Sequence, residues 1–115
     1  KLPGGGWLAT AGDLVRYARA LMAEKIVGRQ SLDAMWTRSK LSSGETTGYG
    51  LGWNIAEVDG VEVVQHSGGQ QGANTHLLLA PDKGIAIAVL SNMENGGTPA
   101  IATEMLKILL RDESK

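Results

Sequence analysis

The stretch Val61-Glu62-Val63-Val64-Gln65-His66-Ser67-Gly68-Gly69 predicts the centre of the fold. Residues 61–65 have the apolar content of a β-strand, and a polar end with two glycines follows directly. Because glycine has no Cβ, another molecule can approach the main chain closely at Gly68 and Gly69. We therefore expect residues 61–65 to lie at an open sheet margin, with the Gly69 N–H facing a groove for a carbonyl or an anion. The alternative is a glycine-rich turn with His66 as a half-buried edge residue.

Three further segments have the pattern of strands. Residues 49–55 alternate bulky with small or polar side chains, and the pair Asp59-Gly60 that precedes the central strand is favoured in tight hairpins. After a glycine-rich turn at 68–72, residues 75–80 are apolar, and residues 85–90 are apolar again after Pro81-Asp82-Lys83-Gly84, a turn sequence. The sequence therefore predicts an antiparallel run of about four strands.

Helical patterns precede and follow these strands. Thr10 and Asp13 have the spacing of a capping box, and apolar residues then recur at helical spacing until Gly28, which supplies a stop. Three helices are expected: one over about residues 11–25, a shorter one capped by Ser31, and one that begins at Thr98-Pro99 with a capping hydroxyl and a proline.

Residues 85–90 contain almost no polar position, as expected for a strand that is covered on both faces, so helices should lie on both sides of the sheet. The order of elements is typical of an α+β fold, with an antiparallel sheet of about four strands flanked by helices. A chain of 115 residues that is 43% hydrophobic is long enough for one domain, residues 1–115, with a single core.

Composition excludes several classes of function. A formal net charge of -1 offers no basic field for nucleic acid. The absence of cysteine excludes disulfides, thiolate catalysis and cysteine-based zinc sites. No apolar run reaches the roughly 20 residues of a membrane helix, and no targeting signal is visible, so the sequence leaves localisation open.

The N-terminal string Gly4-Gly5-Gly6-Trp7-Leu8-Ala9 matches G-x-G-x-x-A, the fingerprint of a dinucleotide-binding loop. That fingerprint requires a preceding buried strand, and only three residues precede the string. We interpret it as a flexible entry loop in which Trp7 anchors the chain against the core.

Several strings, in order, resemble the C-terminal half of the serine β-lactamase and penicillin-binding-protein superfamily. They are most similar to its class C β-lactamase-like branch, which includes D-alanyl-D-alanine carboxypeptidases and esterases. The resemblance implies that the chain is the C-terminal portion of a larger protein with this α/β domain, and that the missing N-terminal half is its partner. The strings are Gly6-Trp7-Leu8-Ala9-Thr10 with Asp13-Leu14, Tyr49-Gly50-Leu51-Gly52-Trp53, His66-Ser67-Gly68-Gly69, Pro81-Asp82-Lys83-Gly84-Ile85 and Leu90-Ser91-Asn92.

In that family a Lys/His-Thr/Ser-Gly strand forms one wall of the active-site cleft, and His66-Ser67-Gly68 matches this motif. The resemblance implies acyl transfer from a small-molecule or peptide amide or ester through a serine acyl-enzyme, without a cofactor or a metal. It also implies a periplasmic or secreted protein. His66 in place of the more usual Lys weakens the case for β-lactam hydrolysis. The implied catalytic residues are His66, Ser67 and Gly69, whose N–H is one oxyanion donor, and the implied substrate-binding residues are Gly68, Asn92 and Asn95.

Two motifs of the family are absent. No serine of the chain has Lys three positions later, so S-x-x-K is missing, and neither tyrosine begins Y-x-N. A serine without a positioned base is not activated, so we expect the isolated chain to be inactive. With part of its sheet and its helical region missing, the chain is expected to expose a sheet edge and an apolar helix surface, and to self-associate, exchange segments or require its other half.

Other classes of function stay open. One is a non-catalytic binding module that retains the fold, and another is a soluble α+β domain whose glycines at the strand end are incidental. A zinc hydrolase that uses His66 and His76 with Asp59 or Asp82 lacks a supporting ligand spacing. At the start of an apolar strand, His76 is more typical of a packed or hydrogen-bonded histidine.

Overall fold

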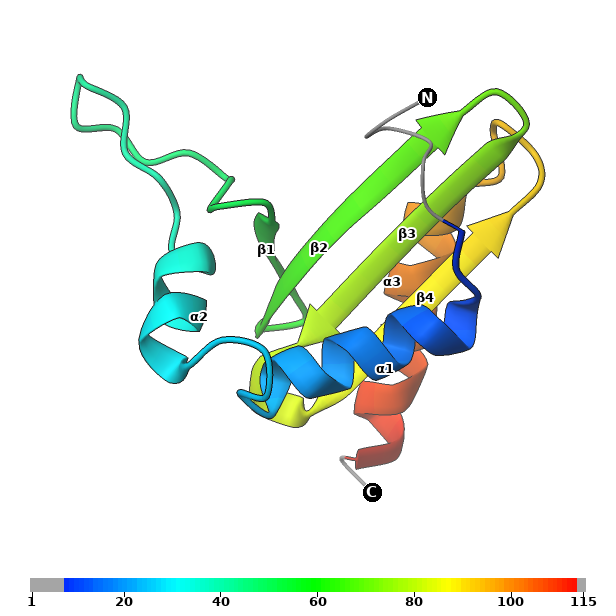
Figure 1. Ribbon diagram of the computed structural model, residues 1–115, viewed down its shortest axis with the longest axis horizontal. Coiled ribbons are helices and arrows are strands. Elements are labelled where there is room, and N and C mark those ends of the chain that lie inside the picture. The colour runs from blue at the N-terminus through cyan, green and yellow to red at the C-terminus, as the bar shows by residue number, and fades with distance from the viewer. Residues whose placement is uncertain (1–7, 114–115) are drawn as a thin grey trace.

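The computed structural model describes residues 8–113, so the predicted anchoring role of Trp7 lies outside the described residues. Four antiparallel strands form one sheet in the order β1-β2-β3-β4, with helices on both faces (Figure 1). This arrangement confirms the predicted α+β fold with its antiparallel sheet. The elements are α1 (Ala11–Met22), α2 (Arg29–Met35), β1 (Asn54–Val58), β2 (Val61–Gln70), β3 (Ala73–Ala80), the 3₁₀ turn η1 (Pro81–Lys83), β4 (Ile85–Ser91) and α3 (Thr98–Glu113).

Each face of the sheet has its own hydrophobic cluster. Because side chains alternate along a strand, Val64 packs with α1 and α2 while its neighbour Val63 packs with α3. Strand β4 contacts both α1 and α3, as its continuous apolar sequence predicted. The α1 side contains the buried residues Ala18, Leu21, Leu32, Trp36, Trp53, Ile55, Val64 and Leu79, and the α3 side contains Val63, Leu78, Ala80, Ile87, Ala102 and Leu106.

The hairpin between β1 and β2 has the predicted two-residue turn. Asp59 and Gly60 both have positive φ, 50° and 80°, as a type I′ turn requires. The predicted turn at 68–72 was wrong, because β2 continues through both glycines and reverses only at Gln71-Gly72. Strand β3 pairs with every residue of this extension, and that pairing overrides the low strand propensity of glycine.

The predicted open margin was wrong for residues 61–65. They pair with β1 on one side, and β3 pairs with β2 on the other from Val64 onward. Asn54, the first residue of β1, pairs with Gln65, so residues 66–70 have only β3 as a neighbour among the named strands. Figure 1 shows this upper part of β2 extending beyond β1. The margin therefore opens one residue after the predicted segment ends.

The predicted strand at 49–55 was also displaced, since β1 covers Asn54–Val58. The backbone before Asn54 bonds to other partners: Ser39 N donates to Tyr49 O at 2.8 Å, and Leu51 N donates to Met35 O at 2.9 Å. Gly52 has a φ of 82°, which a regular strand does not allow. The alternation of bulky and small residues here belongs to a loop that packs against α2.

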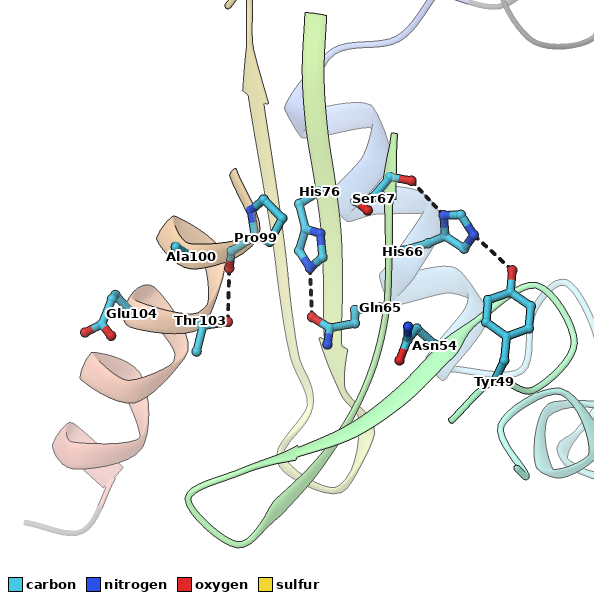
Figure 2. A pocket seen from close by; sticks show the side chains of 10 residues that line it. All are labelled: Tyr49, Asn54, Gln65, His66, Ser67, His76, Pro99, Ala100, Thr103 and Glu104. Atoms are coloured by element: carbon cyan, nitrogen blue, oxygen red, sulfur yellow. Dashed lines mark hydrogen bonds between the residues drawn. The ribbon is translucent and has the colours of Figure 1, made fainter. Parts of the chain in front are cut away.

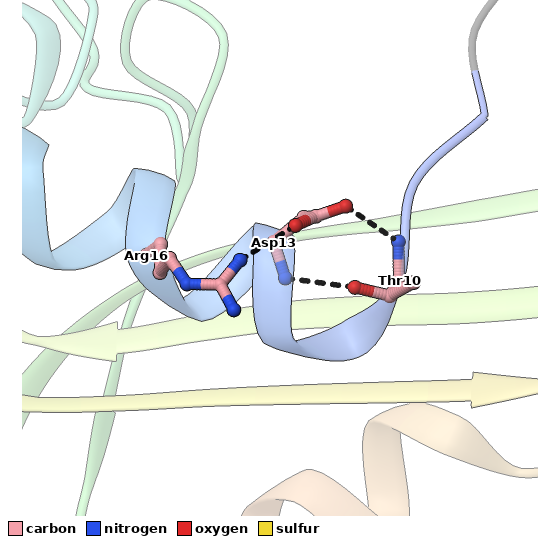
Figure 3. A network of polar contacts seen from close by, with 3 residues as sticks. All are labelled: Thr10, Asp13 and Arg16. Atoms are coloured by element: carbon pink, nitrogen blue, oxygen red, sulfur yellow. Dashed lines mark hydrogen bonds and ion pairs between the residues drawn. The ribbon is translucent and has the colours of Figure 1, made fainter.

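Helix α1 begins with the predicted capping box (Figure 3). Thr10 Oγ1 accepts the Asp13 N–H at 3.0 Å, and Asp13 Oδ2 accepts the Thr10 N–H at 3.2 Å. The hydrogen bonds from Thr10, together with the nearby Arg16 guanidinium, lower the pKa of the Asp13 carboxyl. The helix ends at Met22, three residues before its predicted end, because the chain turns through Glu24, whose φ is 61°.

Two predicted helix caps were wrong, although α3 begins at Thr98 as predicted. Gly28 is the N-cap of α2, which therefore begins two residues before Ser31. The Thr98 hydroxyl does not cap its own helix: both the Thr98 N–H, at 3.2 Å, and the hydroxyl donate to Asn74 Oδ1. That contact fixes the start of α3 to β3. Within residues 8–113 no helix combines the length and the apolar content that crossing a membrane requires.

Candidate functional site

The open part of β2 directs two peptide groups away from the sheet. In an antiparallel pair the residues that flank a two-residue turn are hydrogen-bonded to each other, and the pattern then alternates. Gln70 pairs with Ala73 across such a turn, so Gly68 and His66 bond to β3 as well. The N–H and C=O groups of Ser67 and Gly69 therefore point toward the side where β1 has ended. A Cβ on Gly69 would meet nothing within 4 Å, so this edge is also sterically open.

A groove of about 430 Å³ runs beside this edge and continues onto the α3 face of the sheet. Figure 2 shows His66 and Tyr49 on one side of β2, and Gln65 and His76 on the other side, next to the first turns of α3. Among the predicted site residues, His66 and Ser67 line this groove. The complete lining is Tyr49, Asn54, Gln65, His66, Ser67, His76, Pro99, Ala100, Thr103 and Glu104.

Both ring nitrogens of His66 have partners. Nδ1 lies 2.8 Å from Ser67 O, and Nε2 lies 2.9 Å from the Tyr49 hydroxyl. A carbonyl oxygen can only accept, so Nδ1 carries the proton; in the neutral ring Nε2 then accepts a hydrogen bond from Tyr49. The two rings also meet edge to face, with centroids 5.9 Å apart. Ser67 O thus fixes the tautomer of His66, and Tyr49 fixes the orientation of its ring.

The loop that carries Tyr49 is tightly packed against α2 and β1. A Cβ on Gly50 would lie 2.1 Å from the Met35 carbonyl oxygen, so only glycine fits between α2 and β1. Gly50 N donates to Trp53 O at 2.7 Å, and Trp53 is buried in the core. The string Tyr49-Gly50-Leu51-Gly52-Trp53 therefore holds the tyrosine against β2 from a rigid base.

His76 lies on the α3 side of the groove, opposite Ser67 on β2, and is only 5% exposed. Its Nε2 lies 2.7 Å from Gln65 Oε1, which accepts the Nε2 proton, and its buried Nδ1 has no partner. Burial first, and then the neighbouring charge of a protonated His66, lower the pKa of His76. The interpretation of His76 as a packed, hydrogen-bonded histidine is confirmed.

The remaining predicted residues divide between two places. Gly69 and Asn95 line a second, shallow hollow of about 450 Å³ at the β2–β3 turn. There Glu94 Oε1 accepts the Gly72 N–H at 2.9 Å and ties the loop after β4 to the hairpin. Gly68 and Asn92 line neither hollow. Gly68 instead allows β2 to pass Thr75, whose Oγ1 would lie 2.8 Å from a Cβ at this position.

Sequence reasoning gave no place in the site to the other residues of the groove, among them Tyr49, Gln65 and His76. Tyr49 stood in a string that we had interpreted as a strand, and its distance of 17 residues from His66 gave no local signal. Gln65 and His76 were visible only as single polar positions in otherwise apolar strands, the kind of position where a buried polar pair is to be expected. Among residues 8–113, no three His, Cys, Asp or Glu side chains are placed to hold a metal ion together.

Comparison with known proteins agrees with this architecture. Residues 2–111 match the Beta-lactamase family. The chain belongs to this family of serine hydrolases and penicillin-binding proteins, as the sequence strings predicted.

Individual penicillin-binding proteins are also similar in sequence to this chain. The chain is 30% identical to penicillin-binding protein 4 of Amycolatopsis lactamdurans, over 94% of its own length and 31% of the relative. It is 30% identical to penicillin-binding protein 4* of Bacillus subtilis, over 75% of its own length and 19% of the relative.

Two solved structures share the fold. An octameric penicillin-binding protein homologue from Pyrococcus abyssi superposes with a TM-score of 0.75 and 31% identity, over 89% of this chain and 24% of that one. A D-stereospecific amidohydrolase from Streptomyces sp. gives a TM-score of 0.63 and 30% identity, over 75% and 26% of the two chains. The chain thus spans less than a third of each of these four relatives.

Proposed function

We propose that this chain supplies one wall of an acyl-transfer site, in which a serine outside these 115 residues forms an acyl-enzyme. Gly69 N–H is one of the two oxyanion donors, and it stabilises the negative charge that develops on the substrate carbonyl oxygen in the tetrahedral intermediate. His66 and Ser67 contact the substrate beside that carbonyl. Gly68, Asn92 and Asn95 belong to the same wall as proposed substrate-binding positions.

The open edge at residues 67–69 is the observation that carries this proposal. Main-chain N–H groups that point away from their own sheet, next to a residue without a Cβ, can reach within hydrogen-bond distance of a reacting carbonyl. Family membership supports the reaction class, because serine hydrolases of this kind require an oxyanion donor. The groove beside the edge, of about 430 Å³, gives space for a substrate of small-molecule or short-peptide size.

The role of Gly69 can be tested in a chimera in which this chain replaces the matching segment of the Bacillus subtilis penicillin-binding protein 4*. Gly69→Pro removes the N–H, and prolines are tolerated at sheet edges, whereas Gly69→Ala keeps the N–H in open space. We expect Gly69→Pro to slow acylation by a fluorescent penicillin or an activated ester by about 10²-fold to 10³-fold relative to Gly69→Ala. Thermal melting controls for folding. Equal acylation rates in two folded variants would remove Gly69 from the mechanism.

The isolated 115-residue chain is proposed to be catalytically inactive, because it contains no S-x-x-K and no Y-x-N. Neither a fluorophosphonate nor a penicillin should label any of its serines, and mass spectrometry of the intact protein measures this directly. Stoichiometric labelling would contradict the proposal. A polypeptide that contains this segment without S-x-x-K anywhere would instead favour the second candidate, a non-catalytic binding module with the same fold.

The same proposal predicts that the isolated chain associates with other chains. Strand β4 lies at the end of the sheet, and α3 exposes the apolar side chains Ile101, Met105, Ile108 and Leu109 on the face that does not pack on the sheet. Such surfaces favour self-association, segment exchange or docking of a missing half. The Pyrococcus abyssi relative is itself octameric. Light scattering and calorimetry that show a monomer with cooperative unfolding would contradict this expectation.

A further inference from the structure

A further hollow, of about 510 Å³, lies at the end of the sheet where β2 begins and β3 ends, away from the exposed part of β2 (Figure 1). We call it the α2 hollow, because α2 and the segment after this helix form one of its sides. Among residues 8–113 it shares no lining residue with the groove beside His66. Its described lining residues are Arg29, Asp33, Trp36, Thr37, Arg38, Lys40, Thr46, Ile55, Glu62, Pro81 and Asp82.

The α2 hollow is lined by charges of both signs that do not neutralise one another directly. Arg38 and Lys40 come from the segment after α2, whereas Glu62 comes from β2 and Asp82 from η1. Within residues 8–113 none of these four side chains forms an ion pair. Arg29, in contrast, is already paired with two carboxylates. The hollow therefore offers two cations from the α2 side and two carboxylates from the sheet.

Glu62 has a like charge as its neighbour in the sheet. Val58 and Val61 flank the two-residue turn, so the next pair along the hairpin, Glu57 and Glu62, is the kind that brings side chains closest together. Like charges directly opposite each other repel, and Asp82 adds another carboxylate to the same hollow. No three carboxylates or histidines of residues 8–113 are placed to hold a metal ion. A protonated amine is therefore the cation that fits this side.

The other side of the hollow lacks an acceptor. Trp36 is only 8% exposed, and its buried Nε1–H has no hydrogen-bond partner within residues 8–113. A buried N–H without an acceptor costs free energy, so this indole favours an oxygen that the described chain does not supply. A small shift of the segment after α2 would let an anion held by Arg38 and Lys40 accept this hydrogen bond. A carboxylate is such an anion, and both cations attract it.

We propose that the α2 hollow binds a short peptide whose two termini are both free. Arg38 and Lys40 attract its carboxylate, and Glu62 and Asp82 attract its protonated amine. The peptide chain between the termini spans the distance across which these side chains do not pair. This site goes beyond the acyl-transfer wall and does not rest on it, because the two places have no described residue in common.

Four ligands with the same three alanines test the proposal: trialanine, N-acetyl-trialanine, trialanine amide and N-acetyl-trialanine amide. They differ only in which end carries a charge. We would titrate the ¹⁵N-labelled 115-residue chain at pH 6.5, where the carboxylate is ionised and most of the free amine is protonated. The indole N–H of Trp36 and the backbone N–H groups of Arg38 and Glu62 report binding. We expect trialanine to bind most tightly, and each capped end to weaken binding by about threefold, because ion pairs at exposed side chains contribute modestly.

Two variants should give opposite results. Arg38→Gln removes a cation, so capping the carboxylate should matter less while capping the amine matters as before. Glu62→Gln removes a carboxylate and should give the reverse. Arg19→Gln and Asp112→Asn make the same changes of charge outside the hollow and should leave all four affinity ratios unchanged. The four side chains are exposed, so the variants should fold, and thermal melting checks this.

Equal affinities for the four ligands would overturn the proposal, as would the absence of any signal change with trialanine. It would also fail if Arg38→Gln and Glu62→Gln weakened every ligand by the same factor. Signal changes at Ser67 and Gly69 without changes at Arg38 and Glu62 would place the peptide in the groove and would contradict the α2 hollow. None of these ligands is used in the acylation test on Gly69, so the two results are independent.

Discussion

The two halves of β2 show how one strand can serve both the core and the site. Residues 61–65 pair with β1, and Val63 and Val64 are fully buried on opposite faces. Residues 66–70 continue the same strand, pair only with β3 and are exposed throughout. The change occurs at Gln65, the last residue of β2 that pairs with β1, whose first residue is Asn54. The buried half fixes the register, and the register then decides which peptide groups of the exposed half point outward.

The largest expected difference between the halves is in the effect of a buried charge. Val64 and His66 point to the same face, two residues apart, but Val64 is buried and His66 is exposed. We expect Val64→Asp to lower the free energy of unfolding by about 3–5 kcal/mol, because an unpaired carboxylate would be buried in the core. His66→Asp should lower it by about 1 kcal/mol or less. Urea denaturation of both variants measures the difference, and similar losses would show that the two halves do not differ in this way.

The next comparison concerns the loop that supports the exposed half. We expect Gly50→Ala to destabilise the fold by about 2–3 kcal/mol, since its Cβ would collide with the Met35 carbonyl, a backbone group that cannot rotate away. Gly48→Ala is the matched control, because there the nearest atom, from the Arg38 side chain, is 3.7 Å away. This control should change stability by about 0.5 kcal/mol or less. Calorimetry that finds Gly50→Ala as stable as Gly48→Ala would show that the loop adjusts freely.

These comparisons also show what the sequence could predict. The apolar runs of β3 and β4, the Asp59-Gly60 turn and the capping box at Thr10 are local patterns, and each appeared as predicted. The extent of β2 was not local, because Gly68 and Gly69 became a strand only through their partners on β3. A sequence pattern that depends on a neighbouring strand cannot be read from its own residues.

The predictions of site residues show the same difference between local patterns and contacts that depend on distant residues. The motif His66-Ser67-Gly68 identified the edge that carries the groove, but the motif gave no information about what surrounds it. Tyr49 reaches His66 from a loop 17 residues earlier, and His76 faces Ser67 through the register of β2 and β3. Both contacts depend on pairing and loop closure, which fix distances between residues that are far apart in the chain.

Gly68 and Gly69 should also differ in how much an alanine substitution lowers the free energy of unfolding. A Cβ at Gly68 would lie 2.8 Å from Thr75 Oγ1, whereas a Cβ at Gly69 meets nothing. We expect Gly68→Ala to cost about 1 kcal/mol and Gly69→Ala about 0.5 kcal/mol or less, as measured by urea denaturation. Adding Thr75→Ala should recover part of the loss in Gly68→Ala. A double-mutant cycle without coupling would mean that another contact limits the size of residue 68.

The smallest expected effect is the dependence of stability on pH through His76. Its pKa in the folded chain lies below the usual 6.5, because burial first, and then the charge of His66, disfavour its protonated form. As the pH falls through 6.5, the unfolded chain therefore binds a proton that the folded chain does not, so the free energy of unfolding decreases. The stability that this histidine contributes is present above pH 6.5 and is lost progressively below it.

His76→Phe should remove this part of the pH dependence, because phenylalanine keeps a ring in the buried site and does not titrate. The Gln65 amide loses its partner at every pH, so the informative quantity is the change between pH 7.5 and pH 5.5 and not the stability at either pH alone. The other titratable side chains that line the groove, His66 and Glu104, are present in both proteins. We expect urea denaturation to show a larger loss of stability for the native chain than for His76→Phe between the two pH values. Equal losses would mean that His76 takes up its proton as readily in the folded chain as in the unfolded one, and that the α3 side of the groove is wetter than its 5% exposed histidine indicates.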